Sequence, residues 1–124
     1  MSTNILKTNR GDSFKYNFFV PSDEDISIPY MLTGTDVLYF ALLYPNQKFE
    51  DALILKAYTV GDQNSDGYIQ IEMSPKETQS LVSGIYYYTI KLQQGCIIDD
   101  VIDFTRDNIS VSTLVERTKF LLNE

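Results

Sequence analysis

Apolar and polar side chains alternate along several short segments of this chain, which is the pattern of strands that bury one face. The clearest segment covers residues 84–92, where a glycine is followed by β-branched and aromatic residues. The alternation also predicts strands over residues 13–20, 53–60 and 68–73. Residues 37–44 are almost continuously apolar, which predicts a central strand that is covered on both faces.

The segments between these strands contain turn residues and one helix signal. Residues 26–32 predict only a short, edge-like strand, because Pro29 cannot donate to a ladder. Ser74, Pro75 and Glu77 stand at the spacing of a helix start, in which the side chains of the serine and the glutamate bond to otherwise unpaired amides. We therefore expect one or two helical turns that end near residue 81.

The C-terminal third is less clear. A turn at Gln94 and Gly95 predicts that residues 96–104 return as the antiparallel partner of residues 84–92. Residues 109–124 fit either an alternating strand or one face of a helix. Four β-branched residues in this tail favour the strand: Val111, Thr113, Val115 and Thr118.

About seven short strands and one helical turn predict an all-β protein, an immunoglobulin-like antiparallel β-sandwich. A small barrel remains an alternative, because both folds bury alternating faces. A length of 124 residues indicates one domain. We expect residues 1–9, which are mostly polar, to form a flexible N-terminal arm, and residues 10–124 to form the sandwich.

The composition limits the partners. Ten Lys and Arg against seventeen Asp and Glu leave a net charge of −7, which repels phosphate backbones and anionic lipid surfaces. We therefore expect no nucleic acid and no membrane as partners. No leader-like apolar run is found near Met1, and the longest apolar-rich stretch is shorter than the roughly 20 residues that span a bilayer. The single Cys96 allows no internal disulfide.

The most specific local motif covers residues 62–67, which match the opening half of a calcium-loop pattern. Asp62, Asn64 and Asp66 are its candidate metal ligands. The twelfth position of the pattern is Met73 instead of a bidentate carboxylate, and the flanking segments read as strands. A polar hairpin turn explains the same residues and is the interpretation that we favour, with calcium as the alternative.

Other motifs carry little chemistry. Arg10-Gly11-Asp12 spells a tripeptide that some cell-surface receptors read, but it also suits the turn before a strand. Without histidine, Cys96 lacks the usual base of a nucleophile, so we expect no catalytic residue and no enzyme. A solvated hairpin face explains four aspartates that lie close together: Asp99, Asp100, Asp103 and Asp107.

Three consecutive tyrosines offer both faces of one predicted strand: Tyr86, Tyr87 and Tyr88. Exposed tyrosines anchor protein interfaces or stack on sugars. Packing inside the sheet is the more common role, because at least one face of a strand must point inward. The three residues are nevertheless the candidate interface residues of this chain.

The order of the elements resembles a phage structural domain, the N-terminal domain of the upper baseplate protein of phages that infect Gram-positive bacteria. The resemblance covers residues 10–104 and lies in four segments: Gly11-Asp12-Ser13-Phe14, Leu32-Thr33-Gly34-Thr35, residues 39–45, and Gly84-Ile85-Tyr86-Tyr87-Tyr88 with the glycine turn that follows. That family domain is an immunoglobulin-like β-sandwich that joins virion subunits and catalyses nothing.

The resemblance implies a non-enzymatic virion protein, assembled in the host cytoplasm, whose partners are other virion proteins or copies of itself. The baseplate protein would continue into a linker and a further domain, so positions in the baseplate, tail, neck or capsid decoration all remain open. An alternative from another class is a carbohydrate or host-surface binding module that uses exposed tyrosines and calcium.

Overall fold

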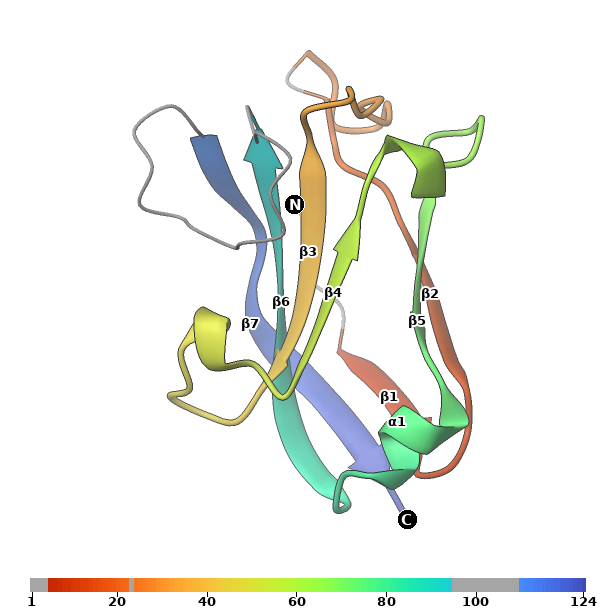
Figure 1. The fold of residues 1–124 in the computed structure, drawn as a ribbon, viewed down its shortest axis with the longest axis vertical. Coiled ribbons are helices and arrows are strands. Elements are labelled where there is room, and N and C mark those ends of the chain that lie inside the picture. Colours follow the sequence, from red (N-terminus) through yellow and green to blue (C-terminus); the bar gives the residue numbers. More distant parts are fainter. Residues whose placement is uncertain (1–4, 23, 95–109) are drawn as a thin grey trace.

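The computed structural model describes residues 5–22, 24–94 and 110–124. Within them, seven strands form two sheets that face each other (Figure 1). The larger sheet has the order β1–β7–β6–β3–β4, with the bounds Leu6–Asn9, Ser110–Asn123, Gly84–Gln94, Val37–Leu43 and Ile54–Tyr58. The smaller sheet pairs β2 (Phe14–Phe18) with β5 (Ile69–Met73). The predicted all-β sandwich is therefore confirmed.

The immunoglobulin-like character is visible at the start of β6. The hydroxyl of Tyr86 donates a hydrogen bond of 2.6 Å to the carbonyl oxygen of Val82, four residues upstream. A tyrosine in this position, which ties the start of a late strand to the corner before it, is a hallmark of immunoglobulin-like sandwiches. Burial raises the pKa of this hydroxyl, so it stays protonated and continues to donate.

The core lies between the two sheets and follows the predicted alternation. Ile69, Ile71 and Met73 of β5 point inward, and the residues between them are exposed. Phe14 meets Phe120 across the sheets edge to face, with ring centroids 5.1 Å apart. These contacts join β2 and β5 to the larger sheet, so the two layers are held together by packed rings and aliphatic chains.

Strand β3 is buried on both faces, as its apolar run predicts. Leu38, Phe40 and Leu42 join the main core, and Tyr39, Ala41 and Leu43 form a second cluster on the opposite face. Phe49, in the 3-10 turn η1 (Phe49–Asp51), covers this second cluster. Strand β3 is nevertheless not central: β6 occupies the middle of the sheet, paired with β3 and β7.

The N-terminal residues differ from the expected arm. Residues Leu6–Asn9 form β1, which pairs in parallel with β7, and Leu6 is buried opposite Phe120. A single apolar residue and the main-chain hydrogen bonds are enough to tie this polar stretch to the sheet. The expectation of a flexible arm therefore does not hold for these four residues, and the larger sheet is not wholly antiparallel.

Of the remaining elements, β7 and α1 agree with the sequence, whereas the edge-like strand expected over residues 26–32 does not form. Strand β7 confirms an extended C-terminal tail. Helix α1 (Pro75–Gln79) begins with the predicted capping box of Ser74 and Glu77. The segment 26–32 makes only an isolated bridge, between Pro21 and Pro29. The predicted strand over residues 96–104 lies outside the described residues, but its predicted pairing with residues 84–92 is wrong, because the two neighbours of β6 are β3 and β7. In the described part of the chain, no helix has the length and hydrophobicity needed to span a membrane.

Candidate functional site

Strand β7 contains two bulges where it pairs with β6. Tyr88 lies opposite Thr118, Ile90 lies opposite Val115, and Lys91 lies opposite Thr113. β7 therefore has one more residue than β6 in each of these two intervals. Bulges of this kind bend a strand and change the face to which the following side chains point.

The bulges divide four consecutive residues of β7 into pairs. Leu114 and Val115 both pack against the main core, whereas Glu116 and Arg117 are both exposed. The hydroxyl of Thr89, which is buried, donates a hydrogen bond of 2.6 Å to the carbonyl oxygen of Val115. This bond satisfies a carbonyl group at the point where the ladder is irregular.

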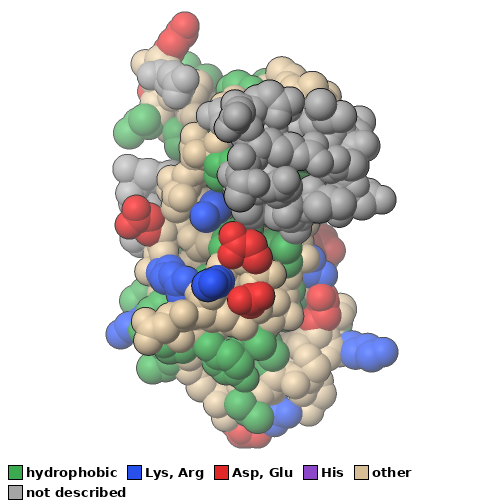
Figure 2. All heavy atoms as spheres, turned by 60° about the vertical axis from the view of Figure 1, so that its left-hand side comes forward, with side chains coloured by type: hydrophobic (Ala, Val, Ile, Leu, Met, Phe, Trp, Pro, Cys, Tyr) green, Lys and Arg blue, Asp and Glu red, His purple; other side chains and the backbone are tan. Residues whose placement is uncertain are grey.

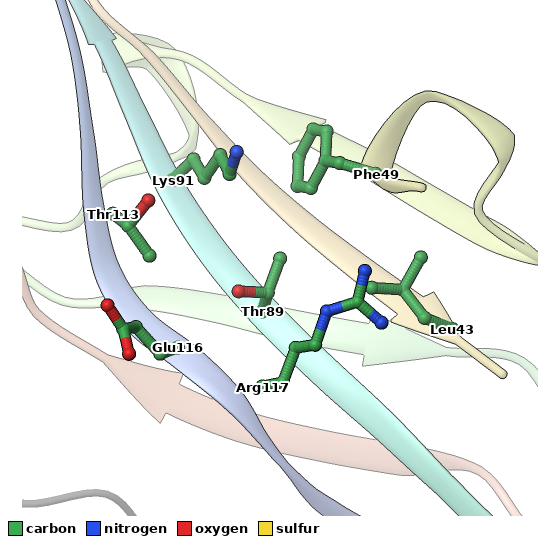
Figure 3. Close-up of a pocket in the computed structure, with 7 residues that line it drawn as sticks. All are labelled: Leu43, Phe49, Thr89, Lys91, Thr113, Glu116 and Arg117. Carbon is green, nitrogen blue, oxygen red and sulfur yellow. The ribbon is translucent and has the colours of Figure 1, made fainter. Parts of the chain in front are cut away.

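Glu116 and Arg117 line a hollow of about 350 Å³ on the side of the larger sheet that faces away from β2 and β5 (Figure 3). Its seven lining residues come from β3, η1, β6 and β7: Leu43, Phe49, Thr89, Lys91, Thr113, Glu116 and Arg117. The hollow combines an aromatic ring, an aliphatic chain, two hydroxyls and charges of both signs. No sequence motif had singled out these residues as a group.

The cations of the hollow are held by other parts of the chain. The amine of Lys91 lies 4.7 Å from the centroid of the Phe49 ring, a cation–π arrangement that Figure 3 shows from the side. The guanidinium of Arg117 extends toward Leu43 and donates from Nη2 to the carbonyl oxygen of Gln47. Both side chains are therefore positioned by neighbours.

The surface beside the hollow is partly apolar. On β6 and β7, Ile85 lies opposite Leu121 and Tyr87 lies between Leu43 and Lys119. Ile85 is 54% exposed, and Tyr87 and Leu121 are half-buried. We call Leu43, Ile85, Tyr87 and Leu121 the apolar strip. On the side of the molecule that is left in Figure 1, charged side chains of both signs lie next to hydrophobic ones (Figure 2).

The three candidate tyrosines have different positions. Tyr86 and Tyr88 are only 2% and 1% exposed, so they belong to the core and cannot act as exposed interface anchors. Tyr86 stacks on Tyr44, and Tyr88 stacks on Phe40. Alternation along β6 turns Tyr87 to the opposite face, where it belongs to the apolar strip.

The candidate calcium ligands serve as turn residues. Asp62 closes the 3-10 turn η2 (Val60–Asp62), because its carboxylate accepts a hydrogen bond of 2.8 Å from the amide of Thr59. Asn64 accepts through Oδ1 from the amides of Asp66 and Tyr68. Gly67 has a φ of 89°, and a Cβ there would clash with Pro29. Among the described residues, no three His, Cys, Asp or Glu side chains are grouped as a metal site. Calcium binding remains a prediction.

The Arg10-Gly11-Asp12 tripeptide joins α1 to the sheets. Arg10 donates from Nε to the carbonyl oxygen of Leu81 at 2.6 Å and from Nη2 to that of Gln79 at 3.0 Å. The amide of Gly11 donates to the hydroxyl of Thr78, which donates to the carbonyl oxygen of Asp12. The turn interpretation accounts for this motif. Cys96 and the cluster of four aspartates lie outside the described residues.

One feature of the sequence could have indicated the site. Leu114-Val115 and Glu116-Arg117 are an apolar pair followed by a charged pair, which breaks strict alternation in a strand. The fold and the site together define an immunoglobulin-like β-sandwich with a charged hollow and an apolar strip on one sheet face. Searches for similar proteins found no matching family model, curated protein or solved structure.

Proposed function

We propose that this chain is a non-enzymatic assembly domain of a phage particle and that it binds another protein through the outer face of its larger sheet. The contact surface would consist of the apolar strip and the rim of the hollow, with Lys91, Glu116 and Arg117. This proposal follows the resemblance in the order of elements. The class of fold by itself implies no function, so the proposal rests on the residues of the outer face.

One observation carries the proposal: the exposed Ile85, the half-buried Tyr87 and Leu121, and a charged rim lie together on one sheet face. The solvent face of an antiparallel sheet is normally polar. Here Ile85, Tyr87 and Leu121 follow one another across β6 and β7, next to the hollow with charges of both signs. Protein interfaces have the same anatomy, an apolar centre with aromatic residues and a polar rim.

The bulges support a role in recognition. They place Glu116 and Arg117 side by side, and Lys91 and Arg117 are each held by a contact to η1 or to the loop before it. Preorganised charges cost less entropy when they bind than flexible ones do. A partner with an apolar centre and both acidic and basic side chains at its edge would fit this surface.

The proposal can be tested by co-expression with the proteins encoded next to this chain in its genome, followed by mass photometry and electron microscopy of the purified complex. We expect the wild-type chain to enter a complex of defined stoichiometry. Ile85→Glu should reduce its incorporation at least tenfold, because a buried charge would be placed in the centre of the contact.

Ile26→Glu is the matched control, because Ile26 is 70% exposed and lies in the loop after β2, at the other end of the sandwich. It should assemble like the wild type. The proposal fails if the wild-type chain enters no complex, or if Ile85→Glu assembles as well as Ile26→Glu. Chelator-sensitive binding to a glycan array would instead favour the carbohydrate-binding alternative.

A further inference from the structure

Two lysines stand beside the apolar strip on the outer face of the larger sheet. Lys7 of β1 lies opposite Leu121, and Lys119 of β7 lies opposite Tyr87. Residues that are directly opposite in a sheet point to the same face, so both lysines point outward with the strip. Both are exposed, and neither amine pairs with a carboxylate among the described residues. Their charges are therefore available to a partner.

The charge of this face is opposite to that of the whole molecule. Arg117 adds a third exposed cation, and Glu116 is the one carboxylate that the described parts of β1, β6 and β7 turn outward. The chain as a whole has a net charge of −7. The outer face is thus a cationic surface on an acidic protein, and it is complementary to a negatively charged surface of a partner.

The same molecule carries such a surface where β4 meets β5 (Figure 1). A hollow of about 460 Å³ is lined there by Lys56, Tyr58, Asp62, Gln70 and Glu72. Lys56 is held by Glu77 at 2.7 Å, whereas no cation pairs with Asp62 or Glu72 among the described residues. Both of these carboxylates are exposed. We call this site the acidic hollow.

The surroundings of the acidic hollow also suit the apolar strip. Val60, in η2 between Tyr58 and Asp62, is 47% exposed, so an apolar side chain borders the acids. Burial raises the pKa of Tyr58, and the negative charges of Glu72 and Asp62 raise it further, since both lie near its hydroxyl. The acidic hollow therefore combines apolar and negatively charged groups, whereas the outer face combines apolar and positively charged ones.

The charges also decide how two copies can meet. If two copies met through the same face, the cations Lys7, Arg117 and Lys119 would stand against each other, which is unfavourable. A head-to-tail contact instead places the cations of one copy against the carboxylates of the next. Exposed charges further apart than about 8 Å are largely screened at physiological salt, so the contacting charges outweigh the repulsion between two acidic chains.

We propose that the partner of the outer face is a second copy of this chain, which binds head-to-tail through its acidic hollow. This inference rests on the proposed function and names the partner. Lys7 and Lys119 of one copy would pair with Asp62 and Glu72 of the next, and the apolar strip would cover Val60. Such a contact leaves one surface of each kind open at the two ends, so copies are added until a ring closes or a filament grows.

Sedimentation velocity of the full chain by itself tests the self-association. We expect species larger than a dimer as the concentration rises toward the millimolar range. Two double variants should each weaken this association about tenfold: Lys7→Gln with Lys119→Gln, and Asp62→Asn with Glu72→Gln. These changes remove charge at exposed positions, and asparagine at position 62 can still accept from the amide of Thr59, so we expect both variants to fold.

A mixture of the two double variants gives the sharpest result. Each variant keeps one intact surface, so the mixture should form a 1:1 heterodimer and nothing larger. Lys15→Gln with Lys76→Gln is the matched control. It removes the same amount of charge from exposed lysines of β2 and α1, which lie away from the outer face, and it should assemble like the wild type.

Three results would overturn the inference: the wild type stays monomeric at millimolar concentration, its association stops at a dimer, or the two double variants assemble as well as the control. A monomeric wild type that still enters a complex with the neighbouring proteins would contradict this inference alone and leave the proposed function in place. Normal self-association of Ile85→Glu would show that the outer face is not the contact and would contradict the inference as well.

Discussion

The amine of Lys56 lies 2.7 Å from a carboxylate oxygen of Glu77, so one ion pair joins the edge strand β4 to helix α1. The same carboxylate accepts a hydrogen bond of 2.9 Å from the amide of Ser74 and so closes the capping box. Lys56 shares the inward face of β4 with Ile54 and Tyr58. A lysine that points inward on an edge strand discourages uncontrolled pairing with other chains.

Glu77 should make the free energy of unfolding depend on pH in the acidic range. Its pKa is lowered: burial opposes ionisation, but the hydrogen bond and charge of Lys56 and the amide of Ser74 outweigh it. A carboxyl group whose folded pKa lies below its unfolded value of 4.5 stabilises the fold above that value, and the contribution is lost as the pH falls through the folded pKa. We expect the wild type to lose more stability than Glu77→Gln between about pH 5.5 and 3.

Urea unfolding at several pH values measures this difference. Glutamine still caps the helix, so at neutral pH Glu77→Gln should cost only about 0.5–1 kcal/mol for the partly exposed ion pair. Lys56→Gln should show the same reduced acid dependence, since it removes the other partner. Identical acid sensitivity in all three proteins would contradict this role of the pair.

Thr89 should be needed for the bulged pairing of β6 and β7. Its hydroxyl is the buried donor to the carbonyl oxygen of Val115. Thr89→Val removes the hydroxyl with little change in shape, so the carbonyl oxygen of Val115 loses this hydrogen bond. The loss should lower the free energy of unfolding by about 1–3 kcal/mol. Thr89→Ser keeps the hydroxyl and is the control. If valine is tolerated as well as serine in chemical unfolding, the bond contributes nothing.

Arg10 should stabilise the fold through its contacts to the end of α1. Its guanidinium bonds to the carbonyl oxygens of Gln79 and Leu81, and it forms an exposed ion pair with Glu124. A lysine in Arg10→Lys can replace only some of the hydrogen bonds of the guanidinium group. The variant should therefore lower the free energy of unfolding by about 1–2 kcal/mol, measured by thermal or urea unfolding. Glu124→Gln removes only the exposed ion pair and should have almost no effect. Equal effects would show that the carbonyl contacts are not important.

The N-terminal strand should contribute to stability in spite of its polar sequence. Leu6 is 8% exposed and packs in the main core, whereas its neighbour Ile5 is 63% exposed. We expect Leu6→Ala to cost about 2 kcal/mol and Ile5→Ala to be close to neutral in urea unfolding. Hydrogen exchange should also show protection of the β1 amides. A neutral Leu6→Ala would restore the flexible arm that the sequence suggested.

Local patterns predicted the elements well. Ile69, Ile71 and Met73 alternate with polar residues, and every one of them points into the core. The capping box at Ser74 and Glu77 forms as expected, because its hydrogen bonds join residues three apart. The long-range arrangement was harder to predict: β1 pairs in parallel with β7, more than a hundred residues further along the chain. No local pattern encodes such a register.

The site was mostly beyond the reach of the sequence. The tyrosine motif did identify β6, but only Tyr87 of the three residues lies outside the core, because alternation turns Tyr86 and Tyr88 inward. The hollow needs Lys91, Phe49 and Arg117, which come from three separate segments. Its position depends on two bulges, which are set by how β7 fits against β6.

The sequence by itself determined which segments are strands, which faces they bury and where α1 begins, because these properties depend on residues two to four positions apart. Only the tertiary structure decided which strands are neighbours and where the ladder bulges. Those features depend on packing and main-chain pairing between distant segments, which the core selects as a whole.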